Sequence, residues 1–180
     1  ISRKNGFDIS KSVKNTLNEN NLIYTEFDFI DINHPDLISF LKKNRKEYYI
    51  FTGGGILKNE ILNSGVKFVH LHPGLTPKYR GSTCFYYSII NEGYAGVTAF
   101  IMDEGLDTGD IIYQKTFEKP QHKFLDEIYD PYIRSETLVD TVSQNLLNKQ
   151  NFKKQNIHEG ETYFIIHPVL KHIAVINCIN

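Results

Sequence analysis

Residues 48–71 carry the order strand, glycine turn, helix and strand, and this order restricts the fold more than any other feature of the chain. The aromatic and β-branched run at residues 48–52 stops at three consecutive glycines, which is typical of a strand that ends in a tight turn. Residues 56–62 then predict a helix, and residues 66–71 predict the next strand. Two strands joined through a helix pair in parallel by a right-handed crossover. We therefore expect an α/β sheet.

The remainder of the chain extends this pattern. Apolar spacing predicts helices at residues 9–20, 35–41, 82–91 and 124–148, the last interrupted near Pro131, and extended segments at residues 23–32, 96–102, 111–117 and 161–166. A doubly wound sheet normally opens with a buried strand, and nothing before Asp8 offers one. We therefore expect the first strand to be absent, and one domain over residues 1–180, since no repeat or linker divides the chain.

Composition restricts the class of protein. The chain has 180 residues, of which 41% are apolar and 23% charged, as in an ordinary soluble globular protein. Twenty Lys and Arg against 21 Asp and Glu leave a net charge of −1, which argues against nucleic acid as a partner. No apolar stretch approaches the roughly 20 residues that span a bilayer. Together with only two cysteines, this predicts a soluble, cytoplasmic protein with no membrane partner.

Two histidines stand at the carboxyl end of the second predicted strand, which is where open α/β sheets bind ligands. His70 and His72 are two residues apart, so their side chains leave the same face of the strand. The loop that follows, residues 73–81, contains two prolines and two glycines that fix its shape. The alternative is that each histidine only bonds a loop carbonyl.

A second loop, residues 103–110, carries four carboxylates between two predicted strands. Solvation alone can account for acids in a loop, because loops are normally polar. A carboxylate beside an imidazole would instead orient that ring and raise its pKa. The two loops together therefore predict an active site more specifically than either loop does alone.

The two loops resemble a known family. His-Pro-Gly-Leu-Thr-Pro-Lys-Tyr-Arg-Gly at residues 72–81, followed by Asp-Glu-Gly-Leu-Asp-Thr-Gly-Asp-Ile-Ile at residues 103–112, is similar to the formyltransferases that use N10-formyltetrahydrofolate. The resemblance covers residues 48–117. It implies a Rossmann-like, open and mostly parallel sheet with helices on both faces. It also implies that the folate lies at the carboxyl ends of the strands.

The resemblance implies a catalytic set of Asn, His and Asp. His72 and Asp107 fall on the family histidine and aspartate, whereas His70 stands where the family has asparagine. As an amine attacks the formyl carbon, protonated His72 would donate to the developing negative oxygen, and His70 would add a second donor. Asp107 would keep His72 charged and order a water for proton transfer. Two adjacent imidazolium ions repel, so we expect one of the two histidines to be neutral.

Binding residues follow from the same resemblance. The segments that would hold the pterin are the glycine turn with Gly54, Gly55, Ile56 and Leu57, and the loop with Asp103, Glu104, Gly105 and Leu106. Lys78 and Arg80 are candidates for a phosphate of the acceptor or the glutamate of the folate. The alternative is that these two loop cations are only solvated.

The acceptor follows by exclusion. Methionyl-tRNA enzymes of the family carry an additional C-terminal domain, for which the 45 residues after Ser135 leave no room, and the charge of −1 disfavours tRNA. The glycine-serine-rich turn of the glycinamide ribonucleotide enzymes is not visible here. We therefore expect a small-molecule amine, a nucleotide-linked amino sugar, as the acceptor.

Other functions and roles stay open. His70, His72 and Asp107 could supply three ligands of a metal-dependent hydrolase, although the prolines of the loop have no rationale there, and we expect no metal. A non-catalytic relative could retain the slot as a binding module. The apolar run at residues 169–179 would complete the core or form an interface between copies of the chain. The cluster Tyr129, Asp130, Tyr132 and Arg134 could line the acceptor site or only pack and be solvated, and we expect packing.

Overall fold

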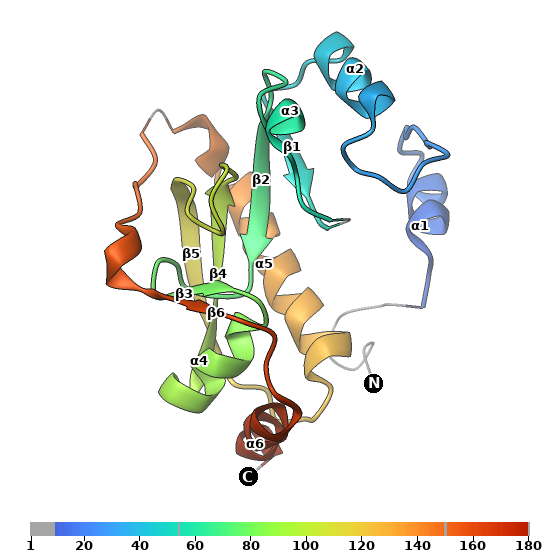
Figure 1. Cartoon of the computed structure of the whole chain (residues 1–180). Coiled ribbons are helices and arrows are strands. Elements are labelled where there is room, and N and C mark those ends of the chain that lie inside the picture. The colour runs from blue at the N-terminus through green and yellow to red at the C-terminus, as the bar shows by residue number, and fades with distance from the viewer. Residues whose placement is uncertain (1–9, 54, 150, 180) are drawn as a thin grey trace.

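The computed structural model describes residues 10–53, 55–149 and 151–179. Its centre is a four-stranded sheet in the order β1 (Tyr48–Phe51), β2 (Lys67–His72), β4 (Tyr94–Ile101) and β5 (Ile111–Glu118) (Figure 1). β1 and β2 are parallel and are connected through α3 (Asn59–Leu62), as the order strand, helix, strand predicts. The expected open α/β sheet is confirmed.

The pairing within the sheet is mixed. β4 runs antiparallel to both β2 and β5, so parallel pairing holds for β1 with β2 but not for the other half of the sheet. For β4 with β5 the physical reason is the length of their connection. It comprises only residues 102–110, which is shorter than the crossover of a dozen residues that parallel strands need.

A second, two-stranded sheet crosses the end of β2. β3 (Tyr79–Gly81) pairs in parallel with β6 (Glu161–Tyr163). β6 confirms the first half of the extended segment predicted at residues 161–166, whereas β3 lies in the loop that sequence analysis treated as irregular. Figure 1 shows this pair below the arrowhead of β2. The small sheet therefore brings the C-terminal part of the chain to the strand end that carries the two histidines.

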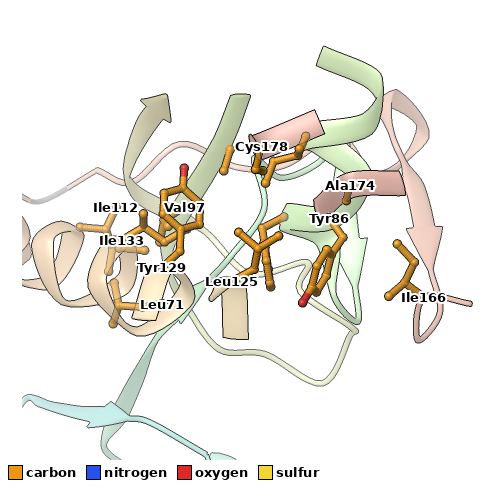
Figure 2. Packing of buried hydrophobic residues seen from close by; sticks show 14 of the residues in the cluster. Leu71, Tyr86, Val97, Ile112, Leu125, Tyr129, Ile133, Ile166, Ala174 and Cys178 are labelled. Carbon is orange, nitrogen blue, oxygen red and sulfur yellow. The ribbon is translucent and has the colours of Figure 1, made fainter. Parts of the chain in front are cut away.

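Helices cover one face of the main sheet. α4 (Cys84–Glu92) and α5 (Asp130–Ser143) pack on β4, and α6 (Pro168–Ile179) packs on α4. The core here contains residues from all of these elements (Figure 2), among them Leu71, Tyr86, Val97, Ile112, Leu125, Tyr129, Ile133, Ile166, Ala174 and Cys178. α6 thus completes the core with Ala174 and Cys178, one of the two roles expected for the apolar run, while Val169 and Ile173 on its other side stay exposed. Both cysteines are free thiols.

A smaller core lies on the opposite face. Phe68, which alternates along β2 with Val69 and therefore faces the other way, packs with Leu41 of α2 (Pro35–Lys43) and Ile61 of α3. His70 and His72 share the face of Phe68 because they follow it at intervals of two. The fold therefore has helices on both faces, and the histidines stand on the face of the smaller core.

The N-terminal part differs from the expectation. α1 (Val13–Glu19) lies within the predicted helix 9–20 and has Ser12 as its N-cap. Asp8, a possible cap for a helix that starts at residue 9, lies outside the described residues. The expected extended segment 23–32 forms no strand, because Ile23 and Ile30 are fully exposed and no neighbouring strand pairs with it. From residue 10 onward no strand precedes β1, and β1 pairs only with β2.

The long predicted helix at residues 124–148 is divided. A π-helical turn (Leu125–Tyr129) leads into α5, whose second residue is Pro131, so the interruption falls where the proline predicts it. Two 3-10 turns follow, Leu146–Asn148 and Ile157–Glu159. Within the described ranges, the helices are all too short or too polar to cross a bilayer.

Candidate active site

His72 ends β2 and is surrounded by protein oxygens. Its side chain is buried, with Nε2 3.0 Å from the carbonyl oxygen of Tyr79 and Nδ1 3.4 Å from Oδ2 of Asp107. A carbonyl oxygen can only accept, so Nε2 carries the hydrogen in that contact. Both ring nitrogens of His72 therefore face acceptors that belong to the protein.

Asp107 is held in place by contacts on both its side chain and its backbone. Its Oδ2 accepts a hydrogen bond of 2.7 Å from the N–H of Gly81, which fixes the acidic loop to β3. The amide of Gln155 donates to the carbonyl of Asp107 at 3.0 Å and to that of Gly109 at 2.6 Å. Asp107 has a φ of 54°, a left-handed conformation that costs a non-glycine residue roughly 1–2 kcal/mol. These contacts hold the loop in that conformation.

The loop after His72 owes its shape to polar side chains of the sheet as well as to its prolines. Thr98 is fully buried and donates to the carbonyl of Gly74 at 2.7 Å, and Gln114 donates to the carbonyl of Thr76 at 2.7 Å. The Thr76–Pro77 peptide bond is cis. A Cβ on Gly74 would lie 2.6 Å from Nε2 of His72, so only glycine fits there.

His70 faces a different set of groups. Its Nδ1 lies 3.0 Å from the carbonyl oxygen of Phe51, its direct neighbour on the parallel strand β1. The ring of Phe100 approaches it at 5.8 Å in an edge geometry. No hydrogen bond to Nε2 of His70 occurs within the described part of the chain, and this nitrogen is not buried away from solvent.

Burial controls the titration of the site. It lowers the pKa of both His70 and His72, because an imidazolium loses its hydration there. The Asp107 carboxylate raises the pKa of His72, as expected, and burial opposes it with the larger effect. Burial also raises the pKa of the Cys84 thiol to about 12, which leaves it protonated at neutral pH.

Two cavities meet at the histidines. The first, of about 180 Å³, lies between the glycine turn and the acidic loop and is lined by Gly55, Ile56, Leu57, Phe100 and residues 102–107. The second, of about 400 Å³, is lined by Pro73, Gly81, Arg134 and residues 163–165, among others. His70, Leu106 and Asp107 line both cavities. We name the first the turn cavity and the second the rim cavity.

The structure thus gathers most of the sequence-predicted residues. Gly55, Ile56, Leu57, Asp103, Glu104, Gly105 and Leu106 line the turn cavity together with His70 and Asp107. His72 lines the rim cavity. Gly54 lies outside the described residues.

Lys78 and Arg80 are the exceptions, because neither lines either cavity. The ammonium of Lys78 forms an ion pair with Glu92. Arg80 is buried and donates to the carbonyls of Ile157 at 3.1 Å and Gly160 at 3.5 Å. The contacts of Arg80 hold β3 against the C-terminal segment.

The cation that lines the rim cavity is Arg134, for which packing was expected rather than a place at the acceptor site. Arg134 of α5 is paired with Asp130 by two hydrogen bonds, from Nε at 2.8 Å and Nη2 at 2.7 Å, and its Nη1 has no partner among the described residues. The expectation that this cluster only packs is therefore incorrect for Arg134. The spacing of Asp130 and Arg134, one helical turn apart, was the signal available. No sequence signal pointed to Gln155.

The described residues contain no group of three or more His, Cys, Asp or Glu side chains placed to hold a metal ion. His72 has both nitrogens engaged by the protein, and His70 has its Nδ1 engaged by Phe51. The structure therefore gives the metal-dependent hydrolase no support.

Comparison with known proteins identifies the family. A model described as "Formyl transferase" matches residues 11–139. The chain belongs to the formyl transferase family. It is 36% identical over 130 residues to the methionyl-tRNA formyltransferase of Clostridium tetani, which covers 69% of this chain and 42% of that protein. The enzyme of the same name from Clostridium perfringens is 35% identical over 151 residues, covering 81% and 48%. The formyl transferase chain thus spans less than half the length of these relatives.

Solved structures of the family share the fold. A methionyl-tRNA formyltransferase from Clostridium thermocellum superposes with a TM-score of 0.60 at 20% identity, covering 87% of this chain and 67% of that one. A sugar N-formyltransferase from Shewanella gives a TM-score of 0.61 at 21% identity, covering 96% and 75%. HypX from Aquifex aeolicus in complex with tetrahydrofolic acid gives 0.57 at 20% identity, covering 77% and 25%. These likenesses confirm the Rossmann-like formyltransferase fold.

The comparisons also correct one expectation. The curated relatives are methionyl-tRNA formyltransferases, named for a substrate carried by a nucleic acid, which contradicts a small-molecule acceptor and no nucleic-acid partner. The error lies in the use of net charge. A total of −1 averages over the whole surface, whereas four cations, Lys42, Lys43, Arg45 and Lys46, lie exposed at and after the end of α2.

Proposed function

We propose that this formyl transferase moves a formyl group from N10-formyltetrahydrofolate to a primary amine. The observation that carries the proposal is the meeting of the turn and rim cavities at His70, Leu106 and Asp107. A transfer between two bound molecules needs two cavities that open onto one point. Donor and acceptor would enter from the two sides of this junction.

The turn cavity suits the pterin end of a folate. It is lined by apolar Ile56, Leu57 and Phe100 and by residues 103–106 of the acidic loop, whose backbone amides and carbonyls would be available to the pterin. A flat heterocycle with amide and amino edges needs this combination of an apolar face and backbone groups. When bound, the folate supplies an activated formyl carbon.

The protein's own groups would position the reactants. Asp107 lies on the wall of both cavities, aimed by the N–H of Gly81 and the amide of Gln155. The two ring nitrogens of His72 contact Asp107 and Tyr79, so we assign His72 to holding the Asp107 carboxylate at the junction of the two cavities. Arg134 presents its Nη1 donors on the wall of the rim cavity. These donors would bind an oxygen of the acceptor next to the amine.

The amine of methionyl-tRNA is the first acceptor to test, because the curated relatives carry that substrate in their names. The rim cavity combines an arginine with exposed apolar side chains, Phe164 and Ile165. An α-amino ester with an apolar side chain offers partners for both, the ester oxygen for Arg134 and the side chain for the apolar rim.

Calorimetry with 5-formyltetrahydrofolate, a stable analogue, tests the cofactor before the acceptor. Wild-type protein should bind one equivalent, Leu57→Arg should abolish binding by filling the turn cavity, and Lys78→Ala, outside both cavities, should bind as wild type. Formyl transfer to methionyl-tRNA is then measured with the same variants. A folded wild type that binds no folate would refute the proposal.

A further inference from the structure

His70 stands at the point where the two reactants of the proposed transfer would meet. It lines the turn cavity and the rim cavity, and also a third, largely apolar space of about 250 Å³ between β1 and α5. Of the two imidazoles at the site, only His70 has a nitrogen without a protein partner among the described residues. Nε2 is therefore the nitrogen of His70 that can contact a reactant.

The hydrogen bond to Phe51 fixes which nitrogen of the neutral ring carries the hydrogen. The carbonyl oxygen 3.0 Å from Nδ1 has no hydrogen to give, so Nδ1 is the donor. Phe51 and His70 are register partners on adjacent parallel strands, and the backbone of the sheet holds this geometry. The neutral ring therefore presents the lone pair of Nε2 to the junction, where an asparagine amide could present a donor.

The groups around His70 favour this neutral form. Burial lowers its pKa most, and the Arg134 guanidinium acts in the same direction, whereas the carboxylates of Asp107 and Asp130 oppose them with smaller effects. His72 lies two residues along β2, and burial lowers its pKa as well. The remaining neighbours from β1 and β4 are the rings of Phe51 and Phe100. A neutral imidazole with an open lone pair is a base.

We infer that His70 is the base of the transfer, an inference that rests on the proposed function. As the lone pair of the acceptor nitrogen forms a bond to the formyl carbon, Nε2 of His70 takes a proton from that nitrogen. As the bond from the formyl carbon to the donor nitrogen breaks, its electron pair stays on the donor nitrogen, and His70 returns the proton there. One proton moves from acceptor to donor, and the imidazole ends in the state in which it began.

This role differs from the one implied by the family resemblance. There, position 70 would add a hydrogen-bond donor for the developing negative oxygen, which a neutral His70 bonded to Phe51 cannot do from Nε2. The chain therefore replaces an amide donor with a proton acceptor. Two outcomes follow that an asparagine could not produce: a fixed tautomer and an acidic limb in the pH dependence.

The tautomer is tested in the free protein, without activity. Long-range ¹⁵N–¹H spectra of the full chain labelled in histidine should show His70 at pH 7 as the Nδ1–H tautomer, with a titration midpoint below the ordinary histidine value of about 6.5. The His70 signals are assigned by their loss in His70→Asn, whose amide can still donate to Phe51. His158→Gln serves as the matched control. A ring protonated on Nε2 alone at pH 7 would overturn the inference.

The pH dependence supplies the second test. Wild-type kcat/KM should decrease as the pH falls below the His70 titration midpoint measured by the spectra. His70→Asn should lose this decrease at low pH, and its rate should be about 10²- to 10⁴-fold lower, the usual contribution of a positioned base. His70→Gln, with an amide at the Nε2 position, should behave alike, while both variants bind 5-formyltetrahydrofolate within about threefold of wild type. An acidic limb that survives in both variants would refute the role of His70. A wild type that binds no folate would instead refute the proposed function, and the spectra would still report the tautomer.

Discussion

Gln155 lies outside the two sequence motifs, and removal of its side chain should destabilise the acidic loop, residues 103–110. The Gln155 amide nitrogen donates to the carbonyls of Asp107 at 3.0 Å and Gly109 at 2.6 Å. Gln155→Ala removes both bonds and leaves two acceptors of a tight loop without their donor. Each such bond contributes about 1 kcal/mol, so the free energy of unfolding should fall by about 2 kcal/mol. For a chain of this size, that corresponds to a melting temperature lower by about 4–8 °C.

Activity should fall as well, because Asp107 depends on these contacts to keep its left-handed backbone. Once the Gln155 bonds are gone, relaxation of φ toward the usual region would withdraw Oδ2 from Gly81 and His72. Gln155→Glu keeps the shape but has no hydrogen to donate when ionised, and it should lose at least as much stability as the alanine variant.

The assay combines thermal unfolding with kcat/KM for formyl transfer. Gln144→Ala, which changes an exposed glutamine at the end of α5, is the control and should shift the free energy by no more than about 0.5 kcal/mol. If Gln155→Ala had the same melting temperature as the control and retained wild-type kcat/KM, the contacts within residues 103–110 would suffice to hold the acidic loop. That result would refute the role of Gln155.

Three further predictions concern the same site. Gly74→Ala should abolish activity and lower the melting temperature, since its Cβ would lie 2.6 Å from Nε2 of His72 and 2.7 Å from the carbonyl of Tyr79, and circular dichroism melts with an activity assay check this. Arg80→Met should cost about 1–2 kcal/mol in urea unfolding by removing its buried donors, with KM for the acceptor unchanged; a raised KM would return Arg80 to acceptor binding. Because burial lowers the pKa of His70 and His72, the unfolded chain binds more protons below the ordinary histidine value of about 6.5, so urea unfolding should show full stability at pH 7.5 and a loss at pH 5.5. In His70→Asn that loss should be smaller, and an equal loss would contradict the assignment.

The fold could be predicted where residues interact locally. The helix start at Pro35 and the break near Pro131 both depend on the backbone restriction of a single proline, and both were predicted correctly. The antiparallel half of the sheet was not predicted, because periodicity shows that a segment is a strand but not the direction of its partner. The extended segment 23–32 is not part of either sheet, since it has no partner strand.

The candidate site divides in the same way. His70, His72 and Asp107 could be selected from two short motifs. Gln155 and Arg134 reach the site from elements more than 20 residues away from Asp107, and nothing in their local sequence indicates that contact. The partners of Arg80 are carbonyl groups of the chain itself, which no side-chain pattern reveals. The two motifs therefore sufficed to select the candidate histidines and aspartate, and the structure was needed to find the groups from distant segments that contact them.

The pairing of β3 with β6 has a consequence for how such an enzyme changes its acceptor. Tyr163, Phe164 and Ile165 form a wall of the rim cavity, yet they lie beyond residues 11–139, which the family model matches. The histidines and the acidic loop are contributed by the matched region. One short C-terminal segment can thus be exchanged for another while the reactive groups stay unaltered. Grafting residues 161–166 from another member of the family is therefore a direct test of whether this segment sets the acceptor of the proposed transfer.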